Sequence, residues 1–395
     1  MFVARRWRRL YEAAQRDRNP DRFFADVTEA IESGAYRPTD FSIRDLFEEF
    51  VPDGREIIAS WSGRSGGTRS GVNLAESGVD TSAFANITGQ VVFSQVLEVF
   101  NDPVFIADRV TRRVPTQFSG EKIPGIGQIG DEAEVVNEGD AYPVAGVSEE
   151  WIETPETTKR GLIVPVTKEA IFFDRTGLVL QRASDVAKWL AVNKEKRVLD
   201  VVLGITATYR RNGRSAVATY GDNSGDHDWD NLAAANALQD YTDVENALLL
   251  FDDMLDPNTG EPILVTPNTI IVPTALLMTA RRVNTATEVR EVTNTNTTTI
   301  SANPLGQPRE GATGGGALEI LSNQYVKARS GSSTDWWIGE PQAAFWYMEN
   351  WPITTAEAPV NSEMEFTHDI VQRFKVSERG TPAVIEPRKM VKSTA

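Results

Sequence analysis

The chain has 395 residues but no cysteine and only two histidines. Without cysteine it cannot form a disulfide framework or a thiolate site for metal or redox chemistry, which favours synthesis in a reducing compartment. No stretch approaches the 18 apolar residues of a membrane-spanning helix, and arginines near the N-terminus stand where a signal peptide needs its apolar core. The composition therefore predicts a soluble globular protein without a membrane partner.

Motifs that carry catalytic chemistry are missing as well. The sequence has no P-loop, no G-x-S-x-G and no H-E-x-x-H. His227 lies in an acidic turn and His368 in a predicted strand, and a lone histidine is more often structural than catalytic. Carboxylates are plentiful, but their spacing singles out no acid–base pair. We predict no catalytic, cofactor-binding or metal-binding residue, and a function that depends on shape and contacts.

Positive charge is scarce, because the net charge is −16. Such a chain lacks the basic faces of a conventional duplex binder. The exception is residues 1–18, with six arginines against Glu12 and Asp17. Residues 2–16 read as a basic amphipathic helix that could lie on a membrane, touch nucleic acid, dock on an acidic partner or pack its apolar stripe on its own chain. The candidate contact residues of this helix are Arg5, Arg6, Trp7, Arg8, Arg9 and Leu10.

The sequence GIGQIG at 125–130 matches the glycine spacing of a dinucleotide-binding turn. That turn needs a buried strand before it and a helix opening after it. Here the preceding run is polar and broken by prolines, and the following run is acidic, which would repel a phosphate. We therefore predict a thin, pliable assembly loop at 115–165, formed by two long strands of a protruding hairpin. Its candidate residues are Gly120, Lys122, Gly125, Gly127, Gly130, Asp131, Glu132, Glu134, Glu138 and Asp140.

Other segments have clear periodicity. Residues 60–71 are rich in glycine and serine and predict a tether, which makes the first 60 residues an arm outside the compact core. Residues 177–204 carry an apolar stripe at helical spacing and predict a helix on the order of 40 Å long. Further short helices are predicted at 21–33 and 41–50.

A second, mixed α/β region follows this helix. Asp222, Asp226, Asp228 and Asp230 alternate without the glycine and glutamate of an EF-hand, so we predict an acidic loop that caps the next helix. Thr242 and Glu245 predict a capping box for a helix at 243–255. Residues 262–265 and 269–273 predict strands, 274–283 a helix, and 284–316 a long surface loop. Residues 317–326, 335–341 and 343–351 are predicted strands, and 365–391 two strands joined around 378–380.

In this order the elements resemble the major capsid proteins of tailed bacteriophages, which have the Hong Kong 97-type fold. The resemblance covers most of residues 84–391. TKRGLIVPVTKEAIFFDRTGLVLQ resembles the strand, short element and entry to the spine helix of that family, and LAVNKEKRVLDVVLG resembles the end of that helix. DWWIGEPQAAFWYMENWPI resembles the strand pair after the axial domain, and FTHDIVQRFKVSERGTPAVIEPRKMV the C-terminal strands.

The resemblance implies an α+β fold built from an N-terminal arm, an extended loop, a spine helix, a peripheral domain and an axial domain. The implied division is 1–83 for the arm, 84–114 for the first peripheral part, 115–165 for the assembly loop, 166–205 for the peripheral domain with the spine helix, 206–345 for the axial domain and 346–395 for the last peripheral strands. Because only a short segment precedes the tether, we expect no proteolytic maturation. A cross-link through Lys122 is not carried over, since no partner residue is identifiable.

The implied function is a major capsid protein that assembles into hexamers and pentamers of an icosahedral shell around double-stranded DNA, in the virion, after assembly in the host cytoplasm. Expected partners are further copies of the chain, portal and scaffolding or decoration proteins, and the packaged DNA indirectly. The first alternative is an encapsulin-type compartment, which the long arm and loop disfavour. The second is a soluble carboxylate-dependent hydrolase, which the missing site motifs disfavour.

Overall fold

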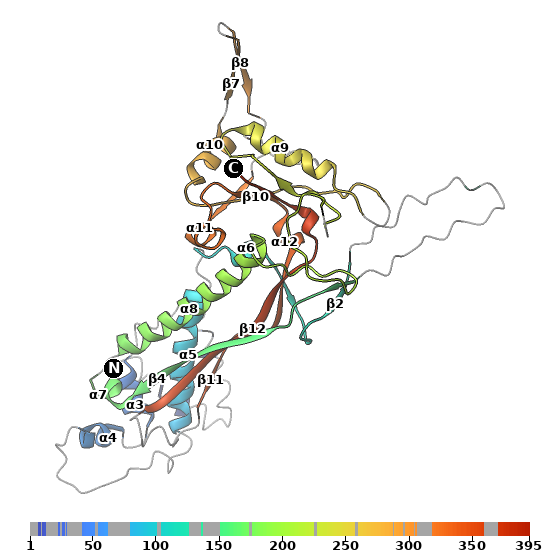
Figure 1. Cartoon of the computed structure of the whole chain (residues 1–395). Coiled ribbons are helices and arrows are strands. Elements are labelled where there is room, and N and C mark those ends of the chain that lie inside the picture. Colours follow the sequence, from blue (N-terminus) through green and yellow to red (C-terminus); the bar gives the residue numbers. More distant parts are fainter. Residues whose placement is uncertain are drawn as a thin grey trace. The chain divides into compact units, whose positions relative to one another are not determined.

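The computed structural model describes 7–8, 10–12, 23, 26–27, 29, 42–51, 54–61, 80–100, 104–125, 136, 151–173, 176–224, 227–256, 260–286, 288–294, 297–303, 305, 318–358 and 370–395. The chain divides into two compact units, and Figure 1 shows their elements. Unit 1 comprises 1–102, 159–192 and 351–379; unit 2 comprises 103–158, 193–350 and 380–395. These boundaries differ from those implied by the resemblance, because they fall inside a long helix and two long strands.

Unit 1 combines helices with part of a sheet. Its elements are α3 Ile43–Phe50, α4 Gly54–Trp61, α5 Asp80–Phe100, β4 Thr158–Thr167, α7 Lys168–Phe172, most of α8 Thr176–Val202, and parts of β11 Phe345–Glu357 and β12 Ile370–Val384. Strand β12 lies between β4 and β11, and α3 packs against α5 and α7. The predicted long helix at 177–204 is confirmed as α8, and the predicted short helix at 41–50 as α3.

The N-terminal residues pack into unit 1 instead of forming an arm outside it. Trp7 and Tyr11 lie in helical conformation and are 2% and 4% exposed. The Tyr11 ring meets the rings of Phe23 and Phe50 edge-on, with centroids 5.4 Å and 6.0 Å away. The prediction of a separate arm is therefore wrong for these residues, because their aromatic stripe is buried in the core of unit 1. The predicted tether beyond Trp61 lies outside the described residues.

Unit 2 is built around a five-stranded sheet in the order β5-β13-β10-β6-β9. Of the three inner strands, β10 and β6 are buried throughout, as expected for strands covered on both faces. The sheet strands are β5 Leu232–Ala233, β6 Thr269–Val272, β9 Glu319–Ser322, β10 Trp336–Gly339 and β13 Met390–Ser393. The helices are α6 Ala107–Val110, α9 Tyr241–Asp252, α10 Leu277–Thr285, α11 Gln324–Ser330, α12 Pro341–Ala344 and the 3₁₀ turn η4 Pro387–Lys389.

Three further pairings complete unit 2. Strand β1 Arg112–Pro115 runs parallel to residues 346–349 of β11. Strands β2 Lys122–Pro124 and β3 Trp151–Glu153 form one two-stranded sheet, and β7 Glu288–Asn294 and β8 Thr297–Ala302 form another. The predicted surface loop at 284–316 is thus wrong over 288–302. Its two valines, its isoleucine and its run of threonines favour a strand, which the overall Asn/Thr content obscured.

Several local predictions around the second region fail for identifiable reasons. The capping box of α9 uses Asp240 and Asp243, two residues earlier than Thr242 and Glu245. The acidic turn caps no helix, because Asp222 pairs with Asp230 and the short strand β5 follows directly. Residues 262–265 form no strand and contribute only an isolated bridge between Leu255 and Pro262.

Gly380 marks a close approach inside a strand and not a turn. The sequence predicts two strands joined at 378–380, but β12 continues from Ile370 to Val384. A Cβ on Gly380 would lie 2.6 Å from Cε1 of Tyr347, whose side chain is 1% exposed. The glycine therefore makes room for the Tyr347 ring, since Gly in a strand often marks such an approach.

Replacing Gly380 with alanine is expected to lower the free energy of unfolding by about 2 kcal/mol, because a buried ring must move to admit the methyl group. Urea denaturation of the purified chain measures this change. In a Tyr347→Ala background the added cost of Gly380→Ala should fall below about 1 kcal/mol, since the clash is gone. An equal cost in both backgrounds would contradict this role of Gly380.

Candidate assembly interface

The base of the predicted assembly loop is a short antiparallel ribbon. Lys122 lies opposite Glu153, Ile123 opposite Ile152, and Pro124 opposite Trp151. Ile152 is 2% exposed and belongs to the main apolar cluster of unit 2. Burying this side chain anchors the ribbon to the body of the unit and stabilises it by roughly 1.5–3 kcal/mol.

Strand β3 has main-chain partners on both of its edges. Besides its pairing with β2, the amide of Glu153 donates to the carbonyl of Arg210 at 3.0 Å, and the amide of Asn212 donates to the carbonyl of Trp151 at 3.0 Å. The side-chain oxygen of Asn212 also accepts from the amide of Trp151 at 3.0 Å. The strand that ends the loop is therefore an inner strand, and β2 is the outer one.

The turn that leads into β2 is fixed by side-chain hydrogen bonds. The hydroxyl oxygen of Thr154 accepts from the amide of Glu121 at 2.8 Å, and the carboxylate of Glu121 accepts from the Thr116 hydroxyl at 2.7 Å. The Asn350 side chain donates to the carbonyls of Thr116 and Phe118, each at 3.0 Å. Both chain ends of the loop thus leave the unit from defined positions.

The described base contains three of the predicted loop residues. Gly120 has a φ of +75°, a conformation that favours glycine and allows the tight turn before β2. The Lys122 ammonium lies 3.5 Å from Oε1 of Glu153 and 4.9 Å from the centre of the Trp151 ring. Gly125 ends the described base. The remaining candidates lie outside the described residues, namely Gly127, Gly130, Asp131, Glu132, Glu134, Glu138 and Asp140.

The predicted extent of the loop needs a correction. Strand β3 ends at Glu153, so this hairpin strand does not reach residue 165; within the described residues, 122–124 pair with 151–153. Residues 158–167 form β4, which pairs with β12. The reason is burial, because Val164 and Val166 are fully buried and commit this stretch to the sheet.

The N-terminal candidate contact residues differ in their exposure, since one is buried in unit 1 and others lie at the surface. Trp7 is buried, so it packs within unit 1, as the self-packing alternative predicted. The Arg8 guanidinium lies 3.0 Å from the Glu12 carboxylate one helical turn later, an exposed pair of the kind worth at most about 0.5 kcal/mol. Leu10 is 51% exposed. Arg5, Arg6 and Arg9 lie outside the described residues, so the contacts of this helix stay predictions.

Glu195 was not singled out from the sequence, and its buried carboxylate contacts the chain segment that leads to the loop. Glu195 is fully buried on α8. Its carboxylate accepts from the amides of Ile106 at 3.2 Å and Ala107 at 2.8 Å, and from the Asn323 side chain at 3.1 Å. Burial raises the pKa of Glu195, although the two amides act in the opposite direction. Helical spacing was the available signal, since 195 lies four residues after Ala191 and three before Val198.

Lys194 and Asp108 form an ion pair beside this carboxylate. The Lys194 ammonium is 2.6 Å from Oδ1 of Asp108 and 4.8 Å from the centre of the Tyr347 ring, and its side chain is 4% exposed. The guanidinium of Arg113, which is more exposed, lies 2.9 Å from Oδ2 of Asp108. Burial alone would raise the pKa of Asp108, but Arg113 and Lys194 outweigh it and lower the pKa. Helix α6 leads directly into β1, which precedes the loop base. These contacts therefore fix the position at which β1 begins.

The described residues contain no group of three or more metal-ligating side chains, and none of their helices is both long and apolar enough to cross a bilayer. His227 hydrogen-bonds the Ala218 carbonyl at 3.0 Å and packs edge-on against Trp229, while His368 lies outside the described residues. Both contacts of His227 are structural in character.

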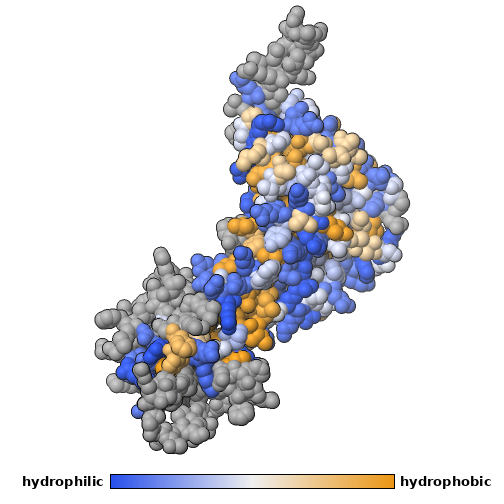
Figure 2. Space-filling model, turned by 60° about the vertical axis from the view of Figure 1, so that its left-hand side comes forward, coloured by the Kyte–Doolittle hydropathy of each residue, from blue (hydrophilic) through white to orange (hydrophobic). Residues whose placement is uncertain are grey.

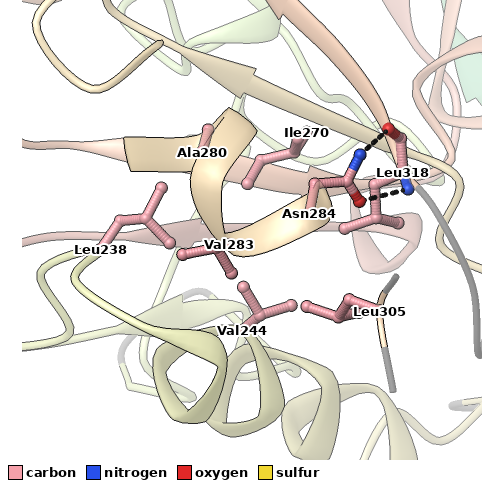
Figure 3. Close-up of a pocket in the computed structure, with 8 residues that line it drawn as sticks. All are labelled: Leu238, Val244, Ile270, Ala280, Val283, Asn284, Leu305 and Leu318. Atoms are coloured by element: carbon pink, nitrogen blue, oxygen red, sulfur yellow. Dashed lines mark hydrogen bonds between the residues drawn. The ribbon is translucent and has the colours of Figure 1, made fainter. Parts of the chain in front are cut away.

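One small cavity lies beneath α10 in unit 2 (Figure 3). Its volume is about 10 Å³, at the lower limit for a single water molecule. Seven of its lining residues are apolar, and the eighth, Asn284, uses its amide to bind the backbone of Leu318 at 2.8 Å and 2.9 Å. A substrate has no room here, and no polar group is left to orient one.

Comparison with known proteins identifies the family of the chain. The family model "phage capsid protein" matches residues 152–393, which is more than half of the chain. The chain therefore belongs to the phage capsid protein family. It is a structural protein of a bacteriophage capsid, as the resemblance implied, and its α+β class is confirmed.

Solved structures with a related fold include shell proteins of several kinds. The virus-like particle from Pyrococcus furiosus is 11% identical, with a TM-score of 0.41, 77% of this chain covered and 98% of that one. A protein structure from Mycobacterium phage Ogopogo is 12% identical in sequence, with a TM-score of 0.40; the match covers 73% of this chain and 91% of that one. An encapsulin complex from Synechococcus elongatus is 12% identical, with a TM-score of 0.39 and coverages of 72% and 85%. Values this low add nothing to the family assignment, and no curated protein matches the chain.

Replacing Asp108 with alanine is expected to lower the free energy of unfolding by about 2 kcal/mol, because it removes the carboxylate that the buried Lys194 ammonium contacts at 2.6 Å. This is below the roughly 3–5 kcal/mol of a fully buried pair, since the Asp108 side chain is 38% exposed. The control Arg113→Ala, which removes the exposed partner, should cost less than about 1 kcal/mol. Chemical denaturation measures both.

The same pair makes a pH prediction with a defined sign. Because the folded pKa of Asp108 lies below the ordinary pKa of an aspartate, its stabilising contribution is present above that ordinary pKa and disappears as the pH falls through the folded pKa. The stability difference between the wild-type chain and Asp108→Asn should therefore shrink between pH 5 and pH 3. A difference that stays constant over this range would contradict the ion pair.

Proposed function

We propose that the chain forms hexamers and pentamers of an icosahedral shell that encloses packaged double-stranded DNA. Membership of the phage capsid family, through residues 152–393, is the observation that carries this proposal. In this reading unit 1 acts as the peripheral part of the subunit and unit 2 as the axial part. The segment between β2 and β3 is the assembly loop that reaches a neighbouring subunit.

The anchored loop base supports this assignment. A loop that must engage a neighbour in a fixed register gains from ends that are already held in place, because less entropy is lost on binding. The base provides this through the buried Ile152, the two-sided pairing of β3 and the side-chain hydrogen bonds of Glu121 and Asn350. The net charge of −16 favours an indirect relation to the packaged DNA, with portal and scaffolding or decoration proteins as further partners.

Exposed apolar side chains supply candidate contact points on both units. On the face drawn in Figure 2, hydrophobic residues reach the surface in several places. The most exposed is Leu264 of unit 2, at 87%, followed by Met278 of α10 at 69%. Others are Leu162, Ile163, Phe173 and Trp189 in unit 1 and Val104, Phe118, Ile205, Leu249 and Leu255 in unit 2. Contiguous exposed apolar surface commonly marks an interaction site.

Electron microscopy and sedimentation of the expressed chain test the shell itself. Closed particles with five-fold and six-fold clusters, which protect DNA from nuclease when made with the rest of the phage, are the expected result. Closed particles that enclose a protein cargo and no DNA would favour an encapsulin-type compartment. A stable monomer at high concentration would contradict assembly and return attention to a soluble enzyme.

Leu264→Asp is expected to reduce particle yield at least tenfold while leaving the folded subunit intact, because an 87% exposed side chain adds little to folding but would be buried between subunits. Leu264→Met keeps an apolar group and should assemble normally. Particle yield is read from sedimentation, and folding from circular dichroism. Normal assembly of Leu264→Asp would exclude this side chain from the subunit interfaces.

A further inference from the structure

The β7/β8 hairpin is a separate projection of unit 2. Its two strands pair antiparallel from Glu288 opposite Ala302 to Asn294 opposite Thr297. They form a sheet of their own, apart from the five-stranded sheet. Each of the two strands contacts the other far more than it contacts any other helix or strand. Figure 1 shows the hairpin reaching beyond the end of unit 2 that carries α10.

An isolated two-stranded hairpin is at best marginally stable in water, because it lacks a third strand or a helix to cover it. Among the described residues no other strand pairs with the outer edge of β7 or of β8. Each outer edge therefore presents a row of backbone donors and acceptors that can accept a further strand. The hairpin has the geometry of a docking element that is completed by pairing.

Strand β8 and the residues that lead into it lack the features that protect an exposed edge, whereas β7 carries Glu288, Arg290 and Glu291. Residues 292–300 read VTNTNTTTI, without a charged residue, a proline or a glycine. Natural edge strands are usually blocked by charges, proline or bulges. The single irregularity, a register shift between Val292 and Asn294, leaves β8 unblocked.

We propose that the outer edges of β7 and β8 pair with the same hairpin of a neighbouring copy of the chain. The proposal rests on the proposed shell, in which copies meet side by side. Two copies that each carry a net charge of −16 repel, so contact is least unfavourable where charge is absent. Main-chain pairing needs no side-chain complementarity, which suits an interface between identical segments. Because each hairpin has two different edges, head-to-tail pairing closes a ring.

Single cysteines test this pairing directly, because the natural chain contains none. One chain carries Val292→Cys in β7, another carries Thr298→Cys in β8, and assembled particles are treated with diamide as the oxidant. Pairing of like edges cross-links each variant by itself, and pairing of β7 with a neighbour's β8 cross-links only mixed particles. Either pattern supports the proposal, since a disulfide requires Cα atoms within about 7 Å.

The matched control is Thr274→Cys, an exposed threonine of unit 2 outside the hairpin, which should give only background cross-linking. Particles that assemble but show no hairpin cross-link above this background, alone or mixed, would overturn the proposal. Wild-type chains that form no particles at all would instead refute the shell, so the two failures are distinguishable.

A deletion gives a second, independent readout. Because Glu288 and Ala302 are paired neighbours, residues 289–301 can be replaced by an Asn-Gly turn. The five-stranded sheet does not include the hairpin, so the shortened chain should keep its circular dichroism and its unfolding midpoint within error. Particle yield is expected to fall at least tenfold. A shortened chain that assembles as well as the wild type would contradict the role of the hairpin.

Discussion

The buried carboxylate of Glu195 holds together three parts of unit 2 that are far apart in the sequence. It accepts hydrogen bonds from the start of α6 and from Asn323 just before α11, while it projects from α8 itself. A fully buried carboxylate is tolerated only when its oxygens accept hydrogen bonds. Three donors bind the oxygens of Glu195. The course of the chain through α6 and β1 to the loop base follows from this arrangement.

Unit 2 presents two projecting hairpins with different support. The described part of the β2/β3 ribbon pairs three residues of each strand, and its inner strand is paired on both edges and buries Ile152. The β7/β8 hairpin is longer, yet it lies outside the main sheet. The β2/β3 ribbon is suited to fix the register of the loop against a neighbouring subunit. The β7/β8 hairpin is suited to become ordered when it contacts a neighbouring subunit. A subunit that assembles many times over needs both kinds of element, because fixed positions give specificity and adaptable ones tolerate unequal neighbours.

The long elements were predictable from the sequence, and the places where tertiary contacts override local signals were not. The apolar stripe of α8 and the aromatic runs of β10 and β11 sit in the structure much as their periodicity predicts. Gly380 suggested a turn, but its meaning depends on the Tyr347 ring, which no local pattern reveals. The hairpin at 288–302 was missed because its Asn/Thr-rich composition was weighed above the strand preference of its valines, isoleucine and threonines. Of the loop candidates, the base was foreseeable, whereas β4 joined a sheet whose other strands lie far along the chain.

The two-sided pairing of β3 has a mechanical consequence. Inter-strand hydrogen bonds run perpendicular to the strands, so tension applied along the ribbon loads several of them together in shear, whereas tension across it would break them one by one. Because β3 is bonded to β2 on one edge and to 210–212 on the other, a neighbour that pulls on the loop spreads the load over both edges. Outward pressure on a closed shell would then be resisted at the root of each loop by bonds that yield collectively.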